Sequence, residues 1–489
     1  MTTPPPDSSP SSSSWISRKV GSLRADKADK ADKADKPTPP ERSTHERLEA
    51  TLRRSGEALA PRVLRRVLTD LQAVVAPRVS EIEGGRRAQA VADWYAAAAP
   101  EERRDLWLLM CEQFAADAAH VQTAQQRYSD AAGTQDAPQA EAHLRRALVS
   151  PRTRLLQRFA VFPQGMRFLV DLRAELLPQL KADRRLLPLD AELEQLFSTW
   201  FDVAFLQLRR LSWDSPASLL EKLIKYEAVH DIKSWADLKN RLDSDRRCYG
   251  FFHPRLPDEP LIFVEVALVD SLSDSVTPLL DEDAAPADLK RATTAIFYSI
   301  SNTQVGLRGV SFGDSLIKHV VETLTEEFPR LRTFATLSPI PGFRAWLAKQ
   351  GAAQLAQLPP KERAELARAL QLEGEPEIAQ VIAAAADGGL QWPPKSPVRQ
   401  FVTRCAARYL ARETKDGRPL DAVARFHLGN GARVERLNWA GDPSAKGVKQ
   451  SFGLMVNYLY DLKRLDRHRA QLAEGRIPAS SEIDGLCKG

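Results

Sequence analysis

Apolar residues recur at spacings of three and four along most of the first half of the chain. The stretches RVLRRVLTDLQAVV (62–75) and RRDLWLLMCEQFAADAAHV (103–121) show this spacing clearly. Such spacing places the apolar side chains on one face of a helix. Only brief Pro and Gly interruptions break the pattern further along. The sequence therefore predicts a bundle of six or more helices from about His45 to Phe197.

The pattern changes near Tyr226. Buried strands are typically short apolar runs, and three such runs follow: LIFVEVALV (261–269), TTAIFYSIS (293–301) and RTFATLS (332–338). A glycine loop and a helical pattern (313–328) separate the last two runs. The helix would bury one apolar face made of Leu316, Ile317, Val320, Val321 and Leu324. Strand, loop, helix and strand in this order predict a parallel βαβ unit.

Two later segments complete the predicted second half. Residues 361–386 (KERAELARALQLEGEPEIAQVIAAAA) have a helical pattern. Residues 424–439 (ARFHLGNGARVERLNW) are interpreted as two strands around an Asn-Gly turn. The second half is therefore a candidate α/β catalytic domain.

The chain divides into three predicted regions. Residues 1–44 are rich in Pro and Ser and contain repeated Ala-Asp-Lys triplets. A segment of this composition buries too little apolar surface to offset its ordering entropy, so it is predicted to be a disordered tail. Residues 45–197 form the predicted helical domain, for which packing and subunit contact are expected. Residues 198–489 form the predicted catalytic domain.

Charge and cysteine content narrow the classes of function. Lys and Arg number 69 against 64 Asp and Glu, a formal charge of +5 over 489 residues. No basic block with interleaved aromatic residues is present, so nucleic acid is not an expected partner. The four cysteines lack C-x-x-C spacing, which argues against a zinc site or a disulfide framework. No apolar stretch approaches the roughly 18 residues of a membrane span. We expect a cytoplasmic protein without a membrane partner.

The glycine loop between the predicted strands is a candidate phosphate site. Its sequence lacks both the G-x-x-x-x-G-K-[ST] and the G-x-G-x-x-G patterns. Arg308 and Gly309, followed by Gly313 at the helix start, would still present free backbone N–H groups to a pyrophosphate. A plain strand-to-helix turn fits the same residues.

Ser338 and His427 are the candidate reactive side chains. Parallel strands end at the same edge of a sheet, and ligands bind at that edge. Ser338 ends the second strand of the βαβ unit, in the stretch LSPIPGF. His427 precedes the Asn-Gly turn by three residues. A turn serine and a packed histidine are the alternative interpretations.

Four segments carry a family resemblance. They are residues 246–268, 296–331 (IFYSISNTQVGLRGVSFGDSLIKHVVETLTEEFPRL), 337–347 (LSPIPGFRAWL) and 426–462 (FHLGNGARVERLNWAGDPSAKGVKQSFGLMVNYLYDL). In this order they closely resemble malonyl-CoA decarboxylases. The resemblance implies an N-terminal helical oligomerisation domain, a GNAT-like (acyl-CoA N-acyltransferase-like) α/β catalytic domain, and a homo-oligomer, a tetramer in the family.

The resemblance also assigns site residues. The family's catalytic pair corresponds to Ser338 and His427. Ser299 and Tyr460 correspond to supporting polar positions; Tyr458 would turn away from Tyr460 if this segment were helical. The coenzyme A loop corresponds to Arg308, Gly309, Val310, Ser311, Phe312, Gly313 and Asp314. Relatives can carry a glutamate where this chain has Ser311, so a carboxylate role there is absent or supplied elsewhere.

The implied reaction converts malonyl-CoA to acetyl-CoA and CO2. Decarboxylation leaves an enolate, which hydrogen-bond donors stabilise and a histidine can protonate. No metal, pyridoxal phosphate or biotin is expected, since the reaction requires none and no site for one is visible in the sequence; coenzyme A is part of the substrate. The same fold supports a CoA-dependent N-acetyltransferase, and a non-catalytic scaffold that binds coenzyme A is a third alternative. The combination of LSPIPGF with FHLGNG favours the decarboxylase.

Overall fold

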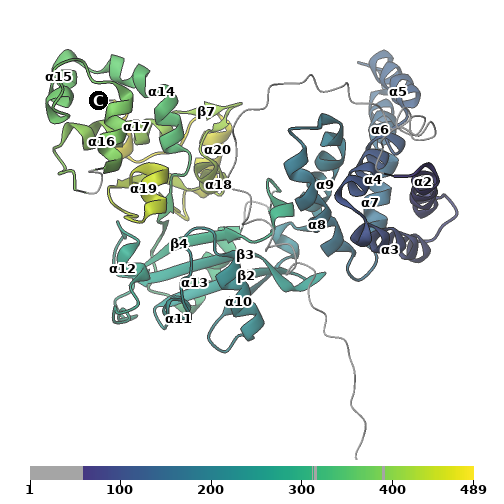
Figure 1. Cartoon of the computed structure of the whole chain (residues 1–489), viewed down its shortest axis with the longest axis horizontal. Helices are drawn as coiled ribbons and strands as arrows, with labels where there is room; N and C mark the ends of the chain where they lie inside the picture. Colours follow the sequence, from purple (N-terminus) through teal and green to yellow (C-terminus); the bar gives the residue numbers. More distant parts are fainter. Residues whose placement is uncertain (1–58, 311, 313–315, 388–390, 489) are drawn as a thin grey trace, which may run out of the picture.

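The computed structural model describes residues 59–310, 312, 316–387 and 391–488. Its first part is entirely helical and occupies one side of the molecule, opposite α14–α17 (Figure 1). The predicted helical bundle is confirmed over the described residues. Its helices are α2 (Pro61–Val75), α3 (Glu81–Ala97), α4 (Pro100–Gln113), α5 (Ala118–Asp130), α6 (Ala137–Leu148), α7 (Pro151–Phe159), α8 (Gly165–Leu176) and α9 (Leu187–Trp200), with short 3₁₀ turns η3 (Leu177–Gln179), η4 (Arg184–Leu186) and η5 (Val203–Phe205).

Local sequence signals explain where these helices begin. Ser80 precedes α3, and its hydroxyl accepts a hydrogen bond from the Glu83 N–H at 3.2 Å. Proline stands at the first turn of α4 and α7, where its missing N–H costs nothing. The apolar faces pack together, and α8 buries Leu169, Val170 and Leu176 completely. Each such side chain contributes about 1.5–3 kcal/mol through burial.

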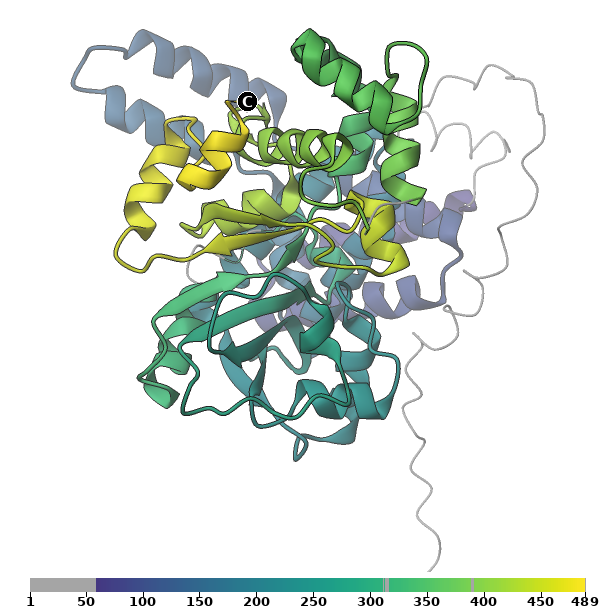
Figure 2. The same ribbon diagram turned by 90° about the vertical axis from the view of Figure 1, so that its left-hand side faces the viewer.

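The second part is built on one mixed sheet with the strand order β1-β2-β3-β4-β5-β10-β6, in which β9 pairs with β10. All neighbouring strands are antiparallel except β4 and β5, which are parallel. Figure 2 shows the C-terminal strands, coloured yellow-green, lying above the teal strands. The strands are β1 (Gln207–Leu211), β2 (Arg246–His253), β3 (Leu256–Val269), β4 (Thr294–Asn302), β5 (Thr333–Thr336), β6 (Ser338–Pro339), β9 (Arg433–Asn438) and β10 (Met455–Leu459).

The predicted βαβ unit is confirmed. Strand β4 runs parallel to β5, with Thr294 opposite Thr333 and Phe297 opposite Thr336. Helix α13 (Leu316–Glu327) connects them and buries the five apolar residues expected to form its inner face. The predicted fold class is confirmed in its main features, a helical N-terminal region followed by an α/β domain with a mixed sheet.

The prediction of two strands over residues 424–439 is wrong in its first half. Residues Ala422–Gly429 form helix α18, and only the second half is a strand, β9. Asp421 starts the helix, because its carboxylate accepts from the N–H groups of Val423 and Ala424, both at 2.9 Å. Gly431 then reverses the chain with φ +87°, a conformation that favours glycine. The Asn-Gly turn exists, but it joins a helix to a strand.

The remaining elements cover the sheet and complete the C-terminal part. The helical pattern predicted for residues 361–386 is confirmed as α15 and α16. The elements are α10 (Ala217–Tyr226), α11 (Trp235–Arg241), α12 (Thr277–Leu280), η6 (Val305–Leu307), α14 (Phe343–Gln357), α15 (Pro360–Ala369), α16 (Ile378–Asp387), α17 (Pro397–Ala411), α19 (Ala445–Ser451), α20 (Leu465–Ala473), α21 (Ser481–Leu486) and the small hairpin β7 (Thr414–Lys415) and β8 (Arg418–Pro419).

One hydrophobic core extends from the helical bundle into the sheet. At the junction, the ring of Phe201 packs edge-on against His253 of β2, with ring centroids 5.1 Å apart. The Val203 N–H also donates to the Phe312 carbonyl at 2.9 Å. The boundary at residues 197 and 198 therefore stays a prediction. Within the described residues, no helix combines the length and apolar character needed to cross a membrane.

Candidate active site

Ser338 and His427 lie next to each other in the folded chain. Ser338 begins β6, and its Oγ is 3.2 Å from Nε2 of His427 in α18. Two features bring them together across 89 residues. Strand β6 pairs with β10, with Ser338 opposite Val456, and α18 packs against the strand that follows it, β9. The two residues selected from the sequence therefore form a hydrogen-bonded pair.

The other side of the His427 ring faces two tyrosines. Nδ1 is 2.7 Å from the Tyr460 hydroxyl. The Tyr458 ring stacks on the imidazole, with centroids 4.7 Å apart and planes inclined by 26°. Tyr458 and Tyr460 therefore both face His427. The helical alternative for this segment is wrong: β10 and its end are extended, so residues two apart share a side.

Burial sets the electrostatics of this group. Ser338 and His427 are only 6% and 3% exposed. Desolvation lowers the pKa of His427 to about 3, because a buried imidazolium loses its hydration. Burial also raises the pKa of Tyr458 and of Tyr460 well above the ordinary value. His427 is therefore neutral near pH 7, and both tyrosines keep their protons.

This shift makes stability depend on pH. The imidazole has an ordinary pKa of 6.5 in the unfolded chain but about 3 in the fold, so the unfolded state binds more protons between these values. The contribution of His427 is therefore complete above about pH 6.5 and is lost as the pH falls towards 3, by up to about 1.4 kcal/mol per pH unit. We expect the thermal midpoint of the parent to fall more steeply than that of His427→Asn between pH 7.5 and 5. Parallel curves would contradict this prediction.

Thr336 completes the hydrogen-bonded group. It is fully buried at the end of β5, two residues before Ser338. The Ser338 hydroxyl donates to Thr336 Oγ1 at 2.8 Å, and the Tyr458 N–H donates to the same oxygen at 3.2 Å. The sequence reasoning missed Thr336. The period of two in an extended chain could have pointed to it, since residues 336 and 338 share a side.

The predicted coenzyme A loop is only partly described. Ser311, Gly313 and Asp314 lie outside the described residues. Arg308 and Gly309 are exposed, and Gly309 has φ +83° with open space where a Cβ would stand. Val310 and Phe312 are instead buried in the core. Only Arg308 and Gly309 of the four described loop residues therefore face solvent.

A residue of the helical bundle is hydrogen-bonded to the backbone of this loop. The guanidinium of Arg173, in α8, donates to the carbonyls of Gly306 and Arg308 at 2.8 and 2.9 Å. Its Nε also pairs with Asp190 of α9 at 2.8 Å. A Cβ at Gly306 would lie 1.9 Å from the Val170 carbonyl, so only glycine permits this close approach. Arg173 is a second residue that the sequence reasoning missed.

Ser299 is bonded to a different partner. Its hydroxyl donates to both carboxylate oxygens of Glu227, at 2.7 and 2.8 Å, and Ser301 donates to Oε2 at 3.1 Å. Ser299 also stands opposite Glu265 on β3. Burial and the nearby Glu227 raise the pKa of the Glu265 carboxyl to about 8. The structure brings Ser338, His427 and Tyr460 together, whereas the Ser299 hydroxyl is committed to Glu227, and a contact with substrate stays a prediction.

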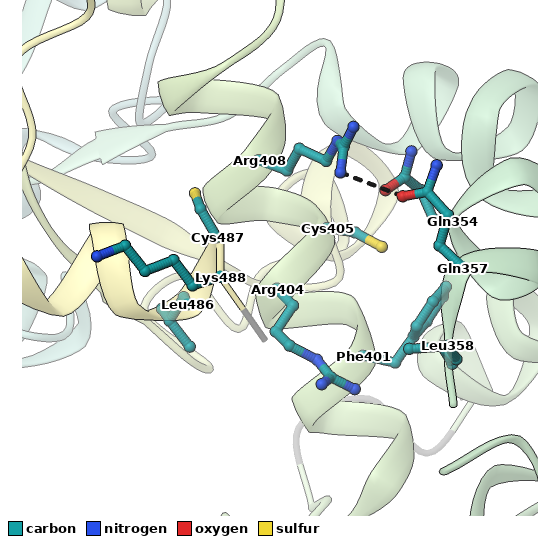
Figure 3. Close-up of a pocket in the computed structure, with 10 residues that line it drawn as sticks. All are labelled: Gln354, Gln357, Leu358, Phe401, Arg404, Cys405, Arg408, Leu486, Cys487 and Lys488. Atoms are coloured by element: carbon teal, nitrogen blue, oxygen red, sulfur yellow. Dashed lines mark hydrogen bonds between the residues drawn. The ribbon is translucent and has the colours of Figure 1, made fainter. Parts of the chain in front are cut away.

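A cavity of about 230 Å³ lies elsewhere, between α14, α17 and the C-terminal residues (Figure 3). Arg404 in its wall is paired with Glu362, and Arg408 donates to Gln357 at 3.3 Å. None of the predicted site residues lines this cavity. Within the described residues, no group of three or more His, Cys, Asp or Glu side chains could hold a metal ion. The candidate active site is therefore the group around Ser338 and His427.

A helical bundle joined to an α/β domain with one mixed sheet, and a buried Ser–His pair between β6 and α18, define a two-domain protein whose second part carries the candidate active site. Two family models match the chain: "Malonyl-CoA decarboxylase N-terminal domain" over residues 114–201 and "Malonyl-CoA decarboxylase C-terminal domain" over residues 204–489. The chain therefore belongs to the malonyl-CoA decarboxylase family.

Individual relatives agree with the family models. The mitochondrial malonyl-CoA decarboxylase of Anser anser anser is 36% identical over 358 residues, covering 71% of each chain. That of Rattus norvegicus is 37% identical over 362 residues, covering 71% of this chain and 73% of the relative. The crystal structure of malonyl-CoA decarboxylase from Rhodopseudomonas palustris is similar with a TM-score of 0.74 and 40% identity, covering 86% of this chain and 99% of that chain. The crystal structure of malonyl-CoA decarboxylase from Cupriavidus metallidurans is similar with a TM-score of 0.68 and 44% identity, covering 87% of this chain and 100% of that chain.

Proposed function

We propose that this protein converts malonyl-CoA to acetyl-CoA and CO2 and that Ser338 and His427 act as its catalytic pair. The observation that carries the proposal is the buried contact of 3.2 Å between Ser338 Oγ and His427 Nε2. Membership in the malonyl-CoA decarboxylase family supports the reaction. The contact supports the assignment of the pair.

The reaction requires the site to stabilise an enolate and to deliver a proton. The bond between C2 and the carboxylate carbon breaks, its electron pair enters the thioester enolate, and CO2 leaves. A proton then adds to C2, and solvent replaces that proton in each turnover. Fixed hydrogen-bond donors stabilise the enolate oxygen more strongly in a dry site than in water. His427 supplies or relays the proton, and Ser338 contacts the malonyl group and takes part in the transfer.

Product analysis tests the reaction class. Purified protein is incubated with malonyl-CoA while acetyl-CoA and CO2 are followed, and in parallel with acetyl-CoA and a panel of amines. Equal amounts of acetyl-CoA and CO2 from malonyl-CoA support the decarboxylase. Persistence of malonyl-CoA, together with amine-dependent loss of acetyl-CoA, would support the N-acetyltransferase instead.

The substrate's coenzyme A is proposed to bind at residues 308–314. The exposed backbone at Gly309, in its left-handed conformation, supports a close approach by phosphate. We further propose that the protein is a homotetramer and is located in the cytoplasm. Its reaction is proposed to need no metal, pyridoxal phosphate or biotin. The four free cysteines are consistent with a reducing compartment.

Replacing Arg173 by lysine tests this assignment of the loop. One ammonium cannot reproduce the planar fork that bonds two carbonyls and Asp190, so the loop should lose its fixed shape. We expect KM for malonyl-CoA to rise by about tenfold, equal to about 1.4 kcal/mol, with a smaller change in kcat. Steady-state kinetics at several malonyl-CoA concentrations measures both constants.

Arg152→Lys is the matched control. Arg152 is also buried in the bundle, donates to the Cys111 carbonyl at 2.9 Å and pairs with Glu192, away from the loop. Its variant should keep the parental KM. Equal effects of the two substitutions on KM would show that Arg173 only stabilises the bundle.

A further inference from the structure

Thr336 receives two hydrogen bonds at a position where it can control Ser338. Its Oγ1 accepts the Ser338 hydroxyl and the Tyr458 N–H. Its carbonyl accepts from Asn457 Nδ2 at 2.8 Å, and Asn457 Oδ1 in turn accepts from Asn438 Nδ2 at 2.8 Å. Thr336 is thus held by the neighbouring strand β10 on two sides. The hydroxyl is a fixed acceptor.

The hydrogen bonds that link Tyr460, His427, Ser338 and Thr336 can all run in one direction. Tyr460 keeps its proton and donates it to Nδ1 of His427. A neutral imidazole carries one N–H, which must then be on Nε2. Nε2 donates to Ser338 Oγ, and the Ser338 hydroxyl donates to Thr336 Oγ1. The opposite tautomer would leave the Tyr460 proton without an acceptor among the described residues, at a cost in free energy for a buried hydroxyl.

We propose that Thr336 is a positioning residue that directs the Ser338 proton away from His427, so that His427 keeps its own proton on Nε2, the nitrogen next to Ser338, from which it can pass to the reacting carbon. The proposal rests on the catalytic pair proposed above. Without the Thr336 hydroxyl, Ser338 can turn its proton towards Nε2 and favour the other tautomer. His427 then holds its proton on the nitrogen that faces Tyr460.

Thr336→Val tests the proposal, because valine keeps the branched shape and removes the acceptor. We expect kcat for malonyl-CoA decarboxylation to fall by about 10- to 100-fold with KM nearly unchanged, since misplaced reacting groups cost rates of this size. Thr336→Ser, which keeps the hydroxyl, should restore most of the rate. Thr294→Val removes a buried threonine hydroxyl from β4 and should leave kcat close to the parental value.

A double variant separates the possible causes. If Thr336 acts through Ser338, adding Thr336→Val to Ser338→Ala causes no further loss of kcat. Full activity of Thr336→Val, or multiplying losses in the double variant, would overturn the inference while leaving the catalytic pair intact. Full activity of Ser338→Ala would instead overturn the pair itself.

If Thr336→Val does not fold, the tautomer of His427 in the parent protein tests the proposal. In protein labelled with ¹⁵N-histidine, the His427 signals are identified by their loss in His427→Asn. Their chemical shifts should show a protonated Nε2 and an unprotonated Nδ1. A proton on Nδ1 would overturn the inference.

Discussion

Replacing Ser338 by alanine is expected to lower kcat for malonyl-CoA decarboxylation by about 10²- to 10³-fold. The hydroxyl is the group that touches His427 Nε2 and is fixed by Thr336. Alanine removes this hydroxyl and leaves the strand and its pairing with β10 intact. Because the loss concerns a group proposed to act in the transition state, KM should change little. Acetyl-CoA formation at saturating malonyl-CoA measures the effect.

The control for Ser338 is another buried serine. Ser396 immediately precedes α17 and is 7% exposed, and its hydroxyl has no hydrogen-bond partner among the described residues. Ser396→Ala should retain the parental kcat. If Ser338→Ala retains it too, Ser338 has no catalytic role and the serine half of the proposed pair is wrong.

Replacing His427 is expected to cost about 10²- to 10⁴-fold in kcat, the range attributed to positioned proton transfer. Asparagine and glutamine are informative together. The longer glutamine can bring an amide N–H close to the place of Nε2, but an amide does not exchange protons readily near neutral pH. Both variants should therefore be slow. A glutamine variant close to the parental rate would show that His427 only donates a hydrogen bond.

His468→Asn separates catalysis from the packing of a buried histidine. His468 lies in α20, is 5% exposed, and contacts the Gly431 carbonyl through Nδ1 at 2.9 Å. Its substitution removes a buried imidazole without touching Ser338, so kcat should stay near the parental value. A loss equal to that of His427→Asn would indicate that both substitutions act through the fold.

The sequence predicts those parts of the fold that depend on local patterns. The runs at 261–269 and 293–301 are mostly apolar and have the short length typical of buried strands, and they lie in β3 and β4. Helix α13 has a regular apolar spacing, and its buried face was predicted residue by residue. Such patterns carry enough information because each element buries one side of itself.

Short or long-range features are harder to predict. Helix α18 has only eight residues, which is too few for a clear helical period. The capping hydrogen bonds of Asp421 decide the conformation of this segment. Ser338 could be placed at a sheet edge by reasoning, but its link to His427 came from the family resemblance. The distance itself depends on β6 pairing with β10. Arg173 lies 135 residues before the loop carbonyl that it binds, and no local pattern records that contact.

The most direct test is malonyl-CoA decarboxylation by the parent, Ser338→Ala, His427→Asn and the double variant, with acetyl-CoA and CO2 followed together. We expect turnover by the parent, strong losses in both single variants, and a double variant no slower than the slower single one, since groups that act as a unit lose their function once. A parent that leaves malonyl-CoA intact would contradict the function. Single variants with parental rates, or losses that multiply, would contradict the pair.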